Sequence, residues 1–313
     1  MLSYFLGRLV ALLPVLLVVA IVVFMLIHVT PGDPARVLLG QDATAEQVAA
    51  LRHDLGLDRP LPLQFALWIG RAVRGDLGLS FFLHLPVTTD IAEHAGPTAM
   101  LALLGLGVAL AIGIPVGIVS AVFRNSWLDQ ASLALAMLGA AVPSFWLGLS
   151  LIVLFAVDLG WLPSSGYRSP GAGLVQSLHY LVLPALALGV PNSSLIIRFT
   201  RSSLLDVLGN DYIRTASAKG LPRPRVIFGH ALRNALVPIL TVVGLTFAAL
   251  MGGAVVTETV FSLPGVGQLV VSSVLRRDYP VIQGVVLLVA TIYVLVNLAV
   301  DMMYFVVDPR VRY

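Results

Sequence analysis

Six apolar stretches without a single Asp, Glu, Lys or Arg constrain this chain more than any other feature. They span residues 9–29, 98–123, 130–157, 180–197, 234–257 and 279–300. Each is close to or above the roughly 20 residues that a helix needs to cross the hydrocarbon of a bilayer. Because backbone groups in lipid must be hydrogen-bonded internally, such spans must be helices. The sequence therefore predicts an all-α polytopic membrane protein with six transmembrane helices.

Composition excludes a soluble domain. Charged residues make up 11% of the chain and hydrophobic residues 58%, whereas soluble domains carry about 25% charged residues. We interpret the first stretch as a retained anchor rather than a signal peptide, because no cleavage site of small residues follows it before Pro31. The chain has no cysteine, which excludes a disulfide framework and a thiolate metal site.

The distribution of Lys and Arg predicts which loops are cytoplasmic. With the N-terminus inside, the cytoplasmic segments hold 11 cations and 5 acids, and the opposite side holds 8 cations and 11 acids. This bias fits the positive-inside rule and places both termini in the cytoplasm. The same distribution explains the pI of 9.4, so we expect contact with membrane lipid and no nucleic-acid partner.

The predicted organisation has an anchor, an outer segment and a core. The anchor helix spans 1–29, and the five-helix core spans 96–304 with a cytoplasmic loop at 200–234 and a C-terminal tail at 305–313. The extracytoplasmic segment, 30–95, is predicted to contain amphipathic helices. One begins at the capping box Thr44 to Gln47 and stops near Gly56, and another covers 63–73 with Trp68 suited to the membrane interface.

The cytoplasmic loop contains the only lysine of the chain, Lys219. The pattern predicts a short helix from Tyr212 to Lys219, which Gly220 terminates and which the prolines at 222 and 224 prevent from continuing. The small residues 216–218 would let another protein approach closely, which favours a docking surface. The alternative is a solvated basic loop that only sets membrane topology.

Several motifs carry a resemblance to a known family. They include "RTASAKG" with "HALRNALVP" in the cytoplasmic loop, "TPGDPA", "GDLGLS", "VPSFWLG", "ETVFSLPGVG" and "RRDYPVIQG". In the order in which they stand along the chain, these motifs resemble those of the inner-membrane permeases of ABC importers, in the dipeptide, oligopeptide, nickel and glutathione branch. The order of anchor helix, outer loop and five-helix core resembles the first permease of the pair. The general loop pattern of these permeases is E-A-A-x-x-x-G-x9-I-x-L-P. Of that pattern only Ala216, Gly220 and Leu232 match.

The resemblance implies a type I ABC importer permease fold and a coupling helix that inserts into a cytoplasmic ATPase. The implied ATPase-coupling residues are Tyr212, Arg214, Thr215, Ala216, Ser217, Lys219 and Gly220, and the implied hinge residues of the loop are Pro222, Arg233 and Asn234. The implied partners are a second homologous permease, two ATPase subunits and an extracytoplasmic substrate-binding protein. The location is then the inner membrane of a bacterium or the membrane of an archaeon.

We expect no enzyme activity and no cofactor in this chain. Lys219 lies between Ala218 and Gly220, so the chain has no phosphate-binding loop, and ATP and magnesium are expected on the partner ATPase. An ion-coupled secondary transporter, the main alternative, would need ionisable groups inside its spans, and the six stretches contain no Asp, Glu, Lys or Arg. A scaffold subunit without a pathway is a third possibility. The histidines lack the spacing of a metal site.

The expected cargo is a dipeptide or oligopeptide, with glutathione, nickel chelates and opines as alternatives. Pro143 is predicted to kink the third span and expose backbone carbonyls to a pathway. Glu258, Arg276 and Asp278 are placed in the outer loop before the sixth span, where their charges would meet the termini of a peptide. In the alternative interpretation they pair with each other or with lipid head groups.

Overall fold

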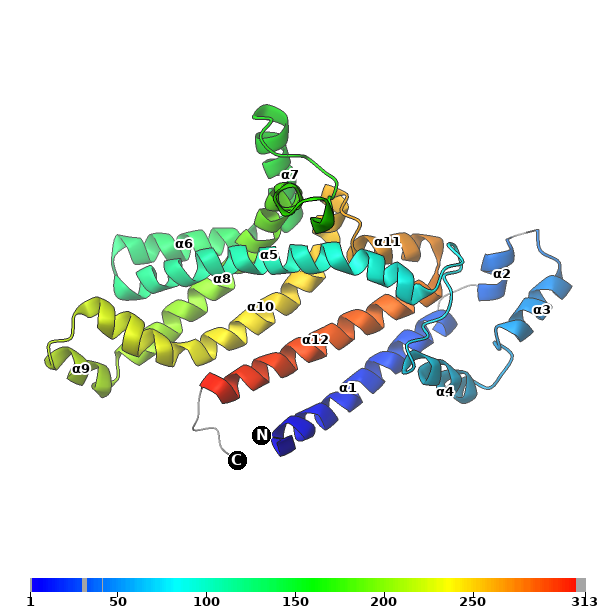
Figure 1. Cartoon of the computed structure of the whole chain (residues 1–313), viewed down its shortest axis with the longest axis horizontal. Coiled ribbons are helices and arrows are strands. Elements are labelled where there is room, and N and C mark those ends of the chain that lie inside the picture. Colours follow the sequence, from blue (N-terminus) through cyan, green and yellow to red (C-terminus); the bar gives the residue numbers. More distant parts are fainter. Residues whose placement is uncertain (1, 30–32, 41, 308–313) are drawn as a thin grey trace. The chain divides into compact units, whose positions relative to one another are not determined.

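A computed structural model describes residues 2–29, 33–40 and 42–307, and its regular structure is nearly all helical (Figure 1). The elements are α1 (Leu2–Val29), α2 (Pro34–Leu39), α3 (Ala45–Asp54), α4 (Leu61–Ala72), α5 (Val87–Val122), α6 (Trp127–Ala141), α7 (Ser144–Leu151), the π-helix η1 (Ile152–Asp158), the 3-10 helix η2 (Pro170–Ala172), α8 (Leu174–Leu208), α9 (Asp211–Ala218), the π-helix η3 (Arg225–Ala231), α10 (Leu232–Phe261), α11 (Val266–Arg276) and α12 (Tyr279–Val307). The predicted tail beyond residue 307, and residues 30–32 of the "TPGDPA" motif, lie outside the described residues.

Five helical segments are long and apolar enough to cross a membrane: Val10–Val29, Val87–Val122, Leu174–Leu208, Arg225–Phe261 and Tyr279–Val300. The third predicted span, 130–157, is not one straight helix. Its two halves, Trp127–Ala141 and Ser144–Asp158, meet at an angle of 96° and count as one span only if the bend is included. Pro143 lies at this break with φ −63° and ψ 137°. Proline cannot donate to the preceding helix and disfavours helical geometry in the residue before it, so the predicted kink is a complete break.

The chain forms two compact units, and the first contains residues 1–95 and 269–295. In it, Phe24 of α1 packs against Phe65 and Trp68 of α4, with ring centroids 5.4 and 5.8 Å away. The capping box at Thr44 and Gln47 is confirmed at the start of α3. Helix α4 confirms the predicted second amphipathic helix and begins two residues earlier than expected. Helix α2, with Asp33 as its N-cap, is an addition that the sequence did not suggest.

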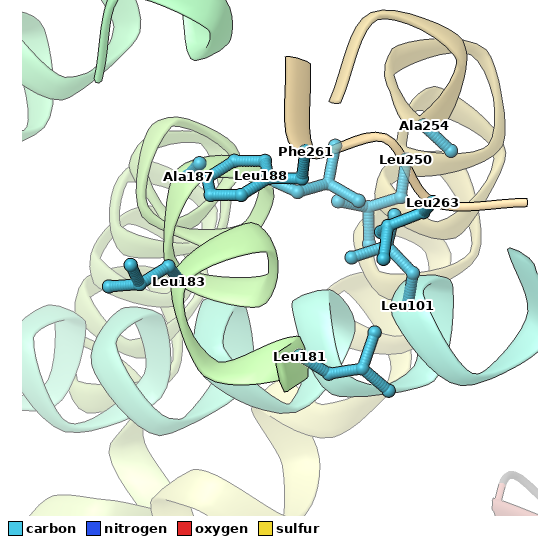
Figure 2. Packing of buried hydrophobic residues seen from close by; sticks show 9 residues of the cluster. All are labelled: Leu101, Leu181, Leu183, Ala187, Leu188, Leu250, Ala254, Phe261 and Leu263. Atoms are coloured by element: carbon cyan, nitrogen blue, oxygen red, sulfur yellow. The ribbon is translucent and has the colours of Figure 1, made fainter. Parts of the chain in front are cut away.

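The second unit contains residues 96–268 and 296–313. Its centre is a cluster of buried apolar side chains from α5, α8, α10 and the loop after α10 (Figure 2). Its members are Leu101, Leu181, Leu183, Ala187, Leu188, Leu250, Ala254, Phe261 and Leu263. Helix α8 has 35 residues, about 52 Å at the usual rise per residue, so it is longer than a bilayer core is thick. Its C-terminal end leads to α9.

Small residues let α5 and α8 pack closely in this unit. A Cβ at Gly113 would overlap the side chain of Ile196, and one at Gly117 would overlap Thr200. Membrane helices associate through such small-residue contacts because lipid provides little hydrophobic drive between them. The backbones of these two helices are therefore in close contact.

Candidate functional site

Helix α9 lies where the sequence predicts a short cytoplasmic helix, displaced by one residue. It covers Asp211–Ala218, with Asn210 at the N-cap position. The Asn210 side chain does not cap α9 but donates to the carbonyl of Asp206, at 3.3 Å, in the end of α8. The side chain thus ties the short connection back to the preceding helix.

The C-terminal end of α9 has the hydrogen bonds of a Schellman motif. Gly220 has φ +79°, and its N–H donates to the Ser217 carbonyl at 3.0 Å. The N–H of Leu221 donates to the Ala216 carbonyl at 3.4 Å. The side chains of Ala216 and Leu221 pack against the same apolar cluster. This combination, with its glycine in the left-handed region, is a well-defined helix stop. The predicted stop at Gly220 is confirmed.

One buried side chain anchors α9. Ile213 is 5% exposed and belongs to a cluster with residues of α5, α8, η3 and α10. The buried members are Ala121, Leu204, Ile213, Val226, Ala231, Ala235 and Ile239. On the other side of α9, Tyr212, Arg214, Thr215, Ala218 and Lys219 are exposed.

An open groove of about 370 Å³ lies beside α9. It is lined by Val122, Leu208, Ile213, Ser217, Leu221, Arg223, Val226 and Ile227. The short helix thus presents a polar outer face with an apolar groove alongside it. Such a surface can receive a protein partner.

The three expected hinge residues have different environments. Pro222 lies in the non-helical link between α9 and η3. Arg233 and Asn234 are in the first turn of α10, and the Asn234 side chain donates to the His230 carbonyl at 2.7 Å. Only Pro222 is in a segment without regular structure, which makes residues 219–222 the better candidate for a hinge.

The structure also shows a cluster of polar side chains that lie far apart in the sequence: Asp129, Arg201 and Ser120. Arg201 of α8 donates from Nε and Nη2 to the two carboxylate oxygens of Asp129, at 2.7 and 2.8 Å. Asp129 is 3% exposed and also accepts from the Ser120 hydroxyl at 2.5 Å. The only signal in the sequence was an Asp beside an N-cap serine, Ser126, at the start of an apolar helix.

Glu258 is not in an outer loop, which corrects its predicted placement. It lies in the last turn of α10 and is fully buried. Its carboxylate accepts from the Thr98 hydroxyl at 2.6 Å and from the Gln268 N–H at 3.0 Å. A Cβ at Gly265 would overlap this carboxylate. Gly265 of the "LPGVG" segment leaves the space that the Glu258 carboxylate occupies. The carboxylate therefore fixes the position of the segment that follows α10.

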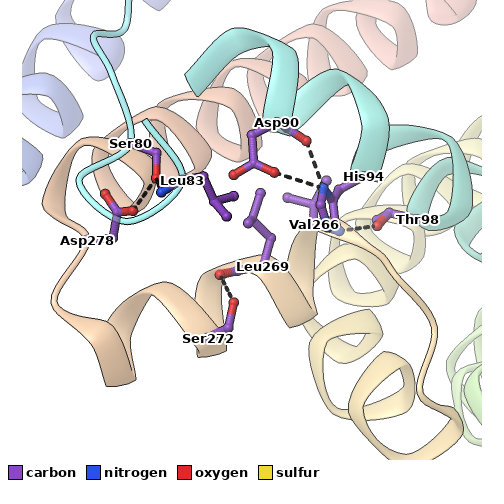
Figure 3. A network of polar contacts seen from close by, with 9 residues as sticks. All are labelled: Ser80, Leu83, Asp90, His94, Thr98, Val266, Leu269, Ser272 and Asp278. Carbon is purple, nitrogen blue, oxygen red and sulfur yellow. Dashed lines mark hydrogen bonds and ion pairs between the residues drawn. The ribbon is translucent and has the colours of Figure 1, made fainter. Parts of the chain in front are cut away.

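Asp278 has a similar role in the first unit, where it is 3% exposed (Figure 3). It accepts from the Ser80 hydroxyl at 2.6 Å and from the backbone N–H of Phe81 at 3.1 Å. Arg276 does not bond to it but lies over the ring of Phe82, 5.1 Å from the centroid. In this conformation Asp278 shapes the turn at 80–83 and leaves little surface for a ligand.

Figure 3 also shows His94, whose Nδ1 lies 3.3 Å from the Asp90 carboxylate. Within the described residues, no three or more His, Asp or Glu side chains gather in an arrangement that could hold a metal ion.

Comparison with protein families gives matches over most of the chain. Residues 113–313 match the family described as the binding-protein-dependent transport system inner membrane component. Residues 1–95 match the N-terminal part of such membrane components.

Curated relatives match from end to end. The glutathione transport system permease protein GsiC of Pectobacterium atrosepticum is 46% identical over 313 residues, which is 100% of both chains. The protein of the same name from Escherichia coli K12 is 44% identical over the same length.

Solved structures of ABC transporters share the fold. An inward-facing structure of the MetNI methionine ABC transporter matches with a TM-score of 0.59 and 20% identity, covering 70% of this chain and 96% of that chain. An amino acid ABC transporter matches with a TM-score of 0.50 and 14% identity, covering 72% of this chain and 95% of that chain.

Proposed function

This chain belongs to the family of binding-protein-dependent transport system inner membrane components, and we propose that it couples to a separate ATPase through α9 to import a small peptide of the glutathione class. As a member of this family it is a multi-pass permease subunit of an ABC importer in the bacterial inner membrane. Family membership excludes the ion-coupled secondary transporter. It also makes the chain a transport subunit rather than an enzyme.

The observation that supports coupling through α9 is its construction as a separate, exposed helix. Ile213 anchors one face, the Schellman motif at Gly220 fixes where the helix ends, and the outer face remains open. A partner that binds Tyr212, Thr215 and Lys219 would push on a compact body rather than on a flexible loop. Force applied there is then transmitted to α8 and α10 through the packed side chains beneath it.

The proposed assembly has this chain and a second homologous permease side by side, each forming half of the pathway. Two cytoplasmic ATPase subunits bind ATP and magnesium, since the chain has no phosphate-binding loop of its own. An extracytoplasmic binding protein delivers the cargo. The outer segment, 30–95, is the proposed surface for that delivery, because it is the longest predicted extracytoplasmic part of the chain.

The proposed cargo is glutathione, a tripeptide, which is narrower than the dipeptide or oligopeptide expected from the sequence. The full-length identity of 44 to 46% with permeases named for glutathione transport supports this choice. The buried positions of Glu258 and Asp278 argue against a direct charge contact between these carboxylates and the cargo. Recognition would then lie mainly with the binding protein.

A reconstituted complex tests both parts of this proposal. The chain, its permease partner, the ATPase subunits and the binding protein would be placed in proteoliposomes with radiolabelled glutathione on the binding-protein side. We expect uptake that needs ATP and the binding protein. Uptake of a labelled dipeptide but not of glutathione would overturn the cargo and leave the coupling intact, whereas ATP-dependent uptake that persists after deletion of residues 211–219 would overturn the coupling.

A further inference from the structure

The C-terminal end of α5 shares an apolar cluster with α9 and is hydrogen-bonded to the link that follows α9. Ala121 of α5 is 2% exposed and lies in the same apolar cluster as Ile213. Arg223 of the link donates from Nη2 to the carbonyl of Val122, at 3.2 Å. Carbonyls in the last turn of a helix lack helical donors, and a cation is favoured there. A displacement of α9 or of its link therefore reaches the end of α5 through this cluster and this hydrogen bond.

The same end of α5 is bound to α8 through Asp129, which lies in the first turn of α6. The carboxylate accepts the two hydrogen bonds from Arg201 of α8 and the bond from Ser120 of α5. It also accepts from the backbone N–H of Asn125, at 3.0 Å. The Asp129 side chain is 4% exposed and that of Arg201 is 22% exposed. A bidentate pair of this kind is among the strongest hydrogen-bonded contacts in proteins, and its geometry is fixed.

The backbone near this pair adds rigidity. Asn125 has φ +62°, in the left-handed region, and its N–H points to the carboxylate that accepts it. One turn before Ser120 on α5, Gly117 leaves no room for a Cβ against Thr200 and the carbonyl of Ile197 on α8. The ion pair thus lies next to the close contact between α5 and α8.

We propose that Asp129 and Arg201 are positioning residues that lock α5 to α8, so that a displacement of α9 moves the two helices as one body. This inference depends on the proposed function of α9. Arg223 carries the displacement to α5, and the cluster around Ile213 carries it to α5 and α8. The Asp129–Arg201 pair holds the two helices together while they move. Without the pair, the ATPase still moves α9, but α5 and α8 no longer shift as one body.

The expected result is a change in the number of ATP molecules hydrolysed per cargo molecule, and not only a loss of transport. In the reconstituted complex, Arg201→Lys keeps the charge but removes the bidentate geometry, and Arg223→Gln breaks the link to Val122. Both variants should transport less cargo for each ATP molecule that they hydrolyse. We expect the number of ATP molecules hydrolysed per cargo molecule to rise roughly five- to tenfold, within the range of typical coupling effects.

Arg198→Gln is the matched control, because Arg198 is an exposed arginine three residues before Arg201 on α8. Its ratio of ATP to cargo should stay normal. Asp129→Asn is the stronger variant, and a buried pair that loses one partner also loses stability, so its thermal midpoint is measured alongside. Arg223 is exposed, which keeps the test valid even if Asp129→Asn does not fold.

Two results distinguish this inference from the proposed function. A ratio in Arg201→Lys and Arg223→Gln equal to that of Arg198→Gln, in a complex that still transports, would overturn the inference alone. A complex in which α9 makes no contact with the ATPase, detected by crosslinking from α9, would overturn the proposed function first. A raised ratio in both variants, with α9 still crosslinked, supports the inference.

Discussion

The α9 region and the Glu258 region both carry charged residues next to long apolar stretches, but the charges are exposed in the first region and buried in the second. Around α9, Arg214 and Lys219 are exposed, and one buried apolar side chain, that of Ile213, anchors the helix. Around Glu258, the carboxylate is enclosed and accepts bonds from another helix and from the following segment. The first arrangement suits contact with a partner and the second suits support of the local fold. Charge in a membrane protein therefore indicates a role only once its neighbours are known.

The largest effect should come from Glu258→Ala. The substitution removes the acceptor of the buried Thr98 hydroxyl and of the Gln268 N–H, and a buried donor that loses its acceptor costs about 1–3 kcal/mol. We expect a marked drop in the thermal midpoint of the purified chain in detergent, with Glu258→Gln in between. A variant of normal stability that transports poorly would instead make Glu258 a pathway residue.

An intermediate effect is expected at Gly220. A Cβ there would meet no atom within 4 Å, so a substitution acts only through the backbone at φ +79°. A residue with a side chain costs about 1–2 kcal/mol in this region, and asparagine tolerates it better than most. Gly220→Val should lower transport and transport-linked ATP hydrolysis while the spans stay folded, and Gly220→Asn should retain most of both. Equal activity in the two variants would show that the stop is not needed.

The smallest effect on stability should come from Arg214→Gln. Arg214 lies 3.7 Å from Asp211, and both side chains are mostly exposed, at 78% and 96%. Exposed pairs of this kind contribute little, so the thermal midpoint should not move measurably. A clear loss of ATPase binding in this variant would assign Arg214 to the docking contact, and a clear loss of stability would contradict the contrast with Glu258.

Features set by local rules could be predicted from the sequence. The uncharged stretches predicted six spans, of which five are single helices and one is a bent pair. The capping box at Thr44 predicted the start of α3, and Gly220 predicted the end of α9. Each depends on residues within a turn or on simple apolar length. The break at Pro143 was underestimated, because a proline in an apolar run is compatible with either a mild kink or a full turn of the chain.

Features set by distant residues could not be predicted. Glu258 bonds to Thr98, 160 positions away, and Asp129 bonds to Arg201, 72 positions away. Neither pair leaves a periodic pattern. Glycines near Glu258, in "LPGVG", indicated a turn, but nothing in that segment showed that the space they free is filled by a carboxylate.

Crosslinking from α9 tests the central claim most directly. The chain contains no cysteine, so Ala218→Cys introduces a single reactive thiol on the exposed face of α9, and Val175→Cys, 81% exposed at the start of α8, serves as the control. In native membranes carrying the complete transporter, a short thiol crosslinker should join Ala218→Cys to the ATPase subunit and should not join Val175→Cys to it. A functional transporter in which Ala218→Cys captures no ATPase would contradict the account.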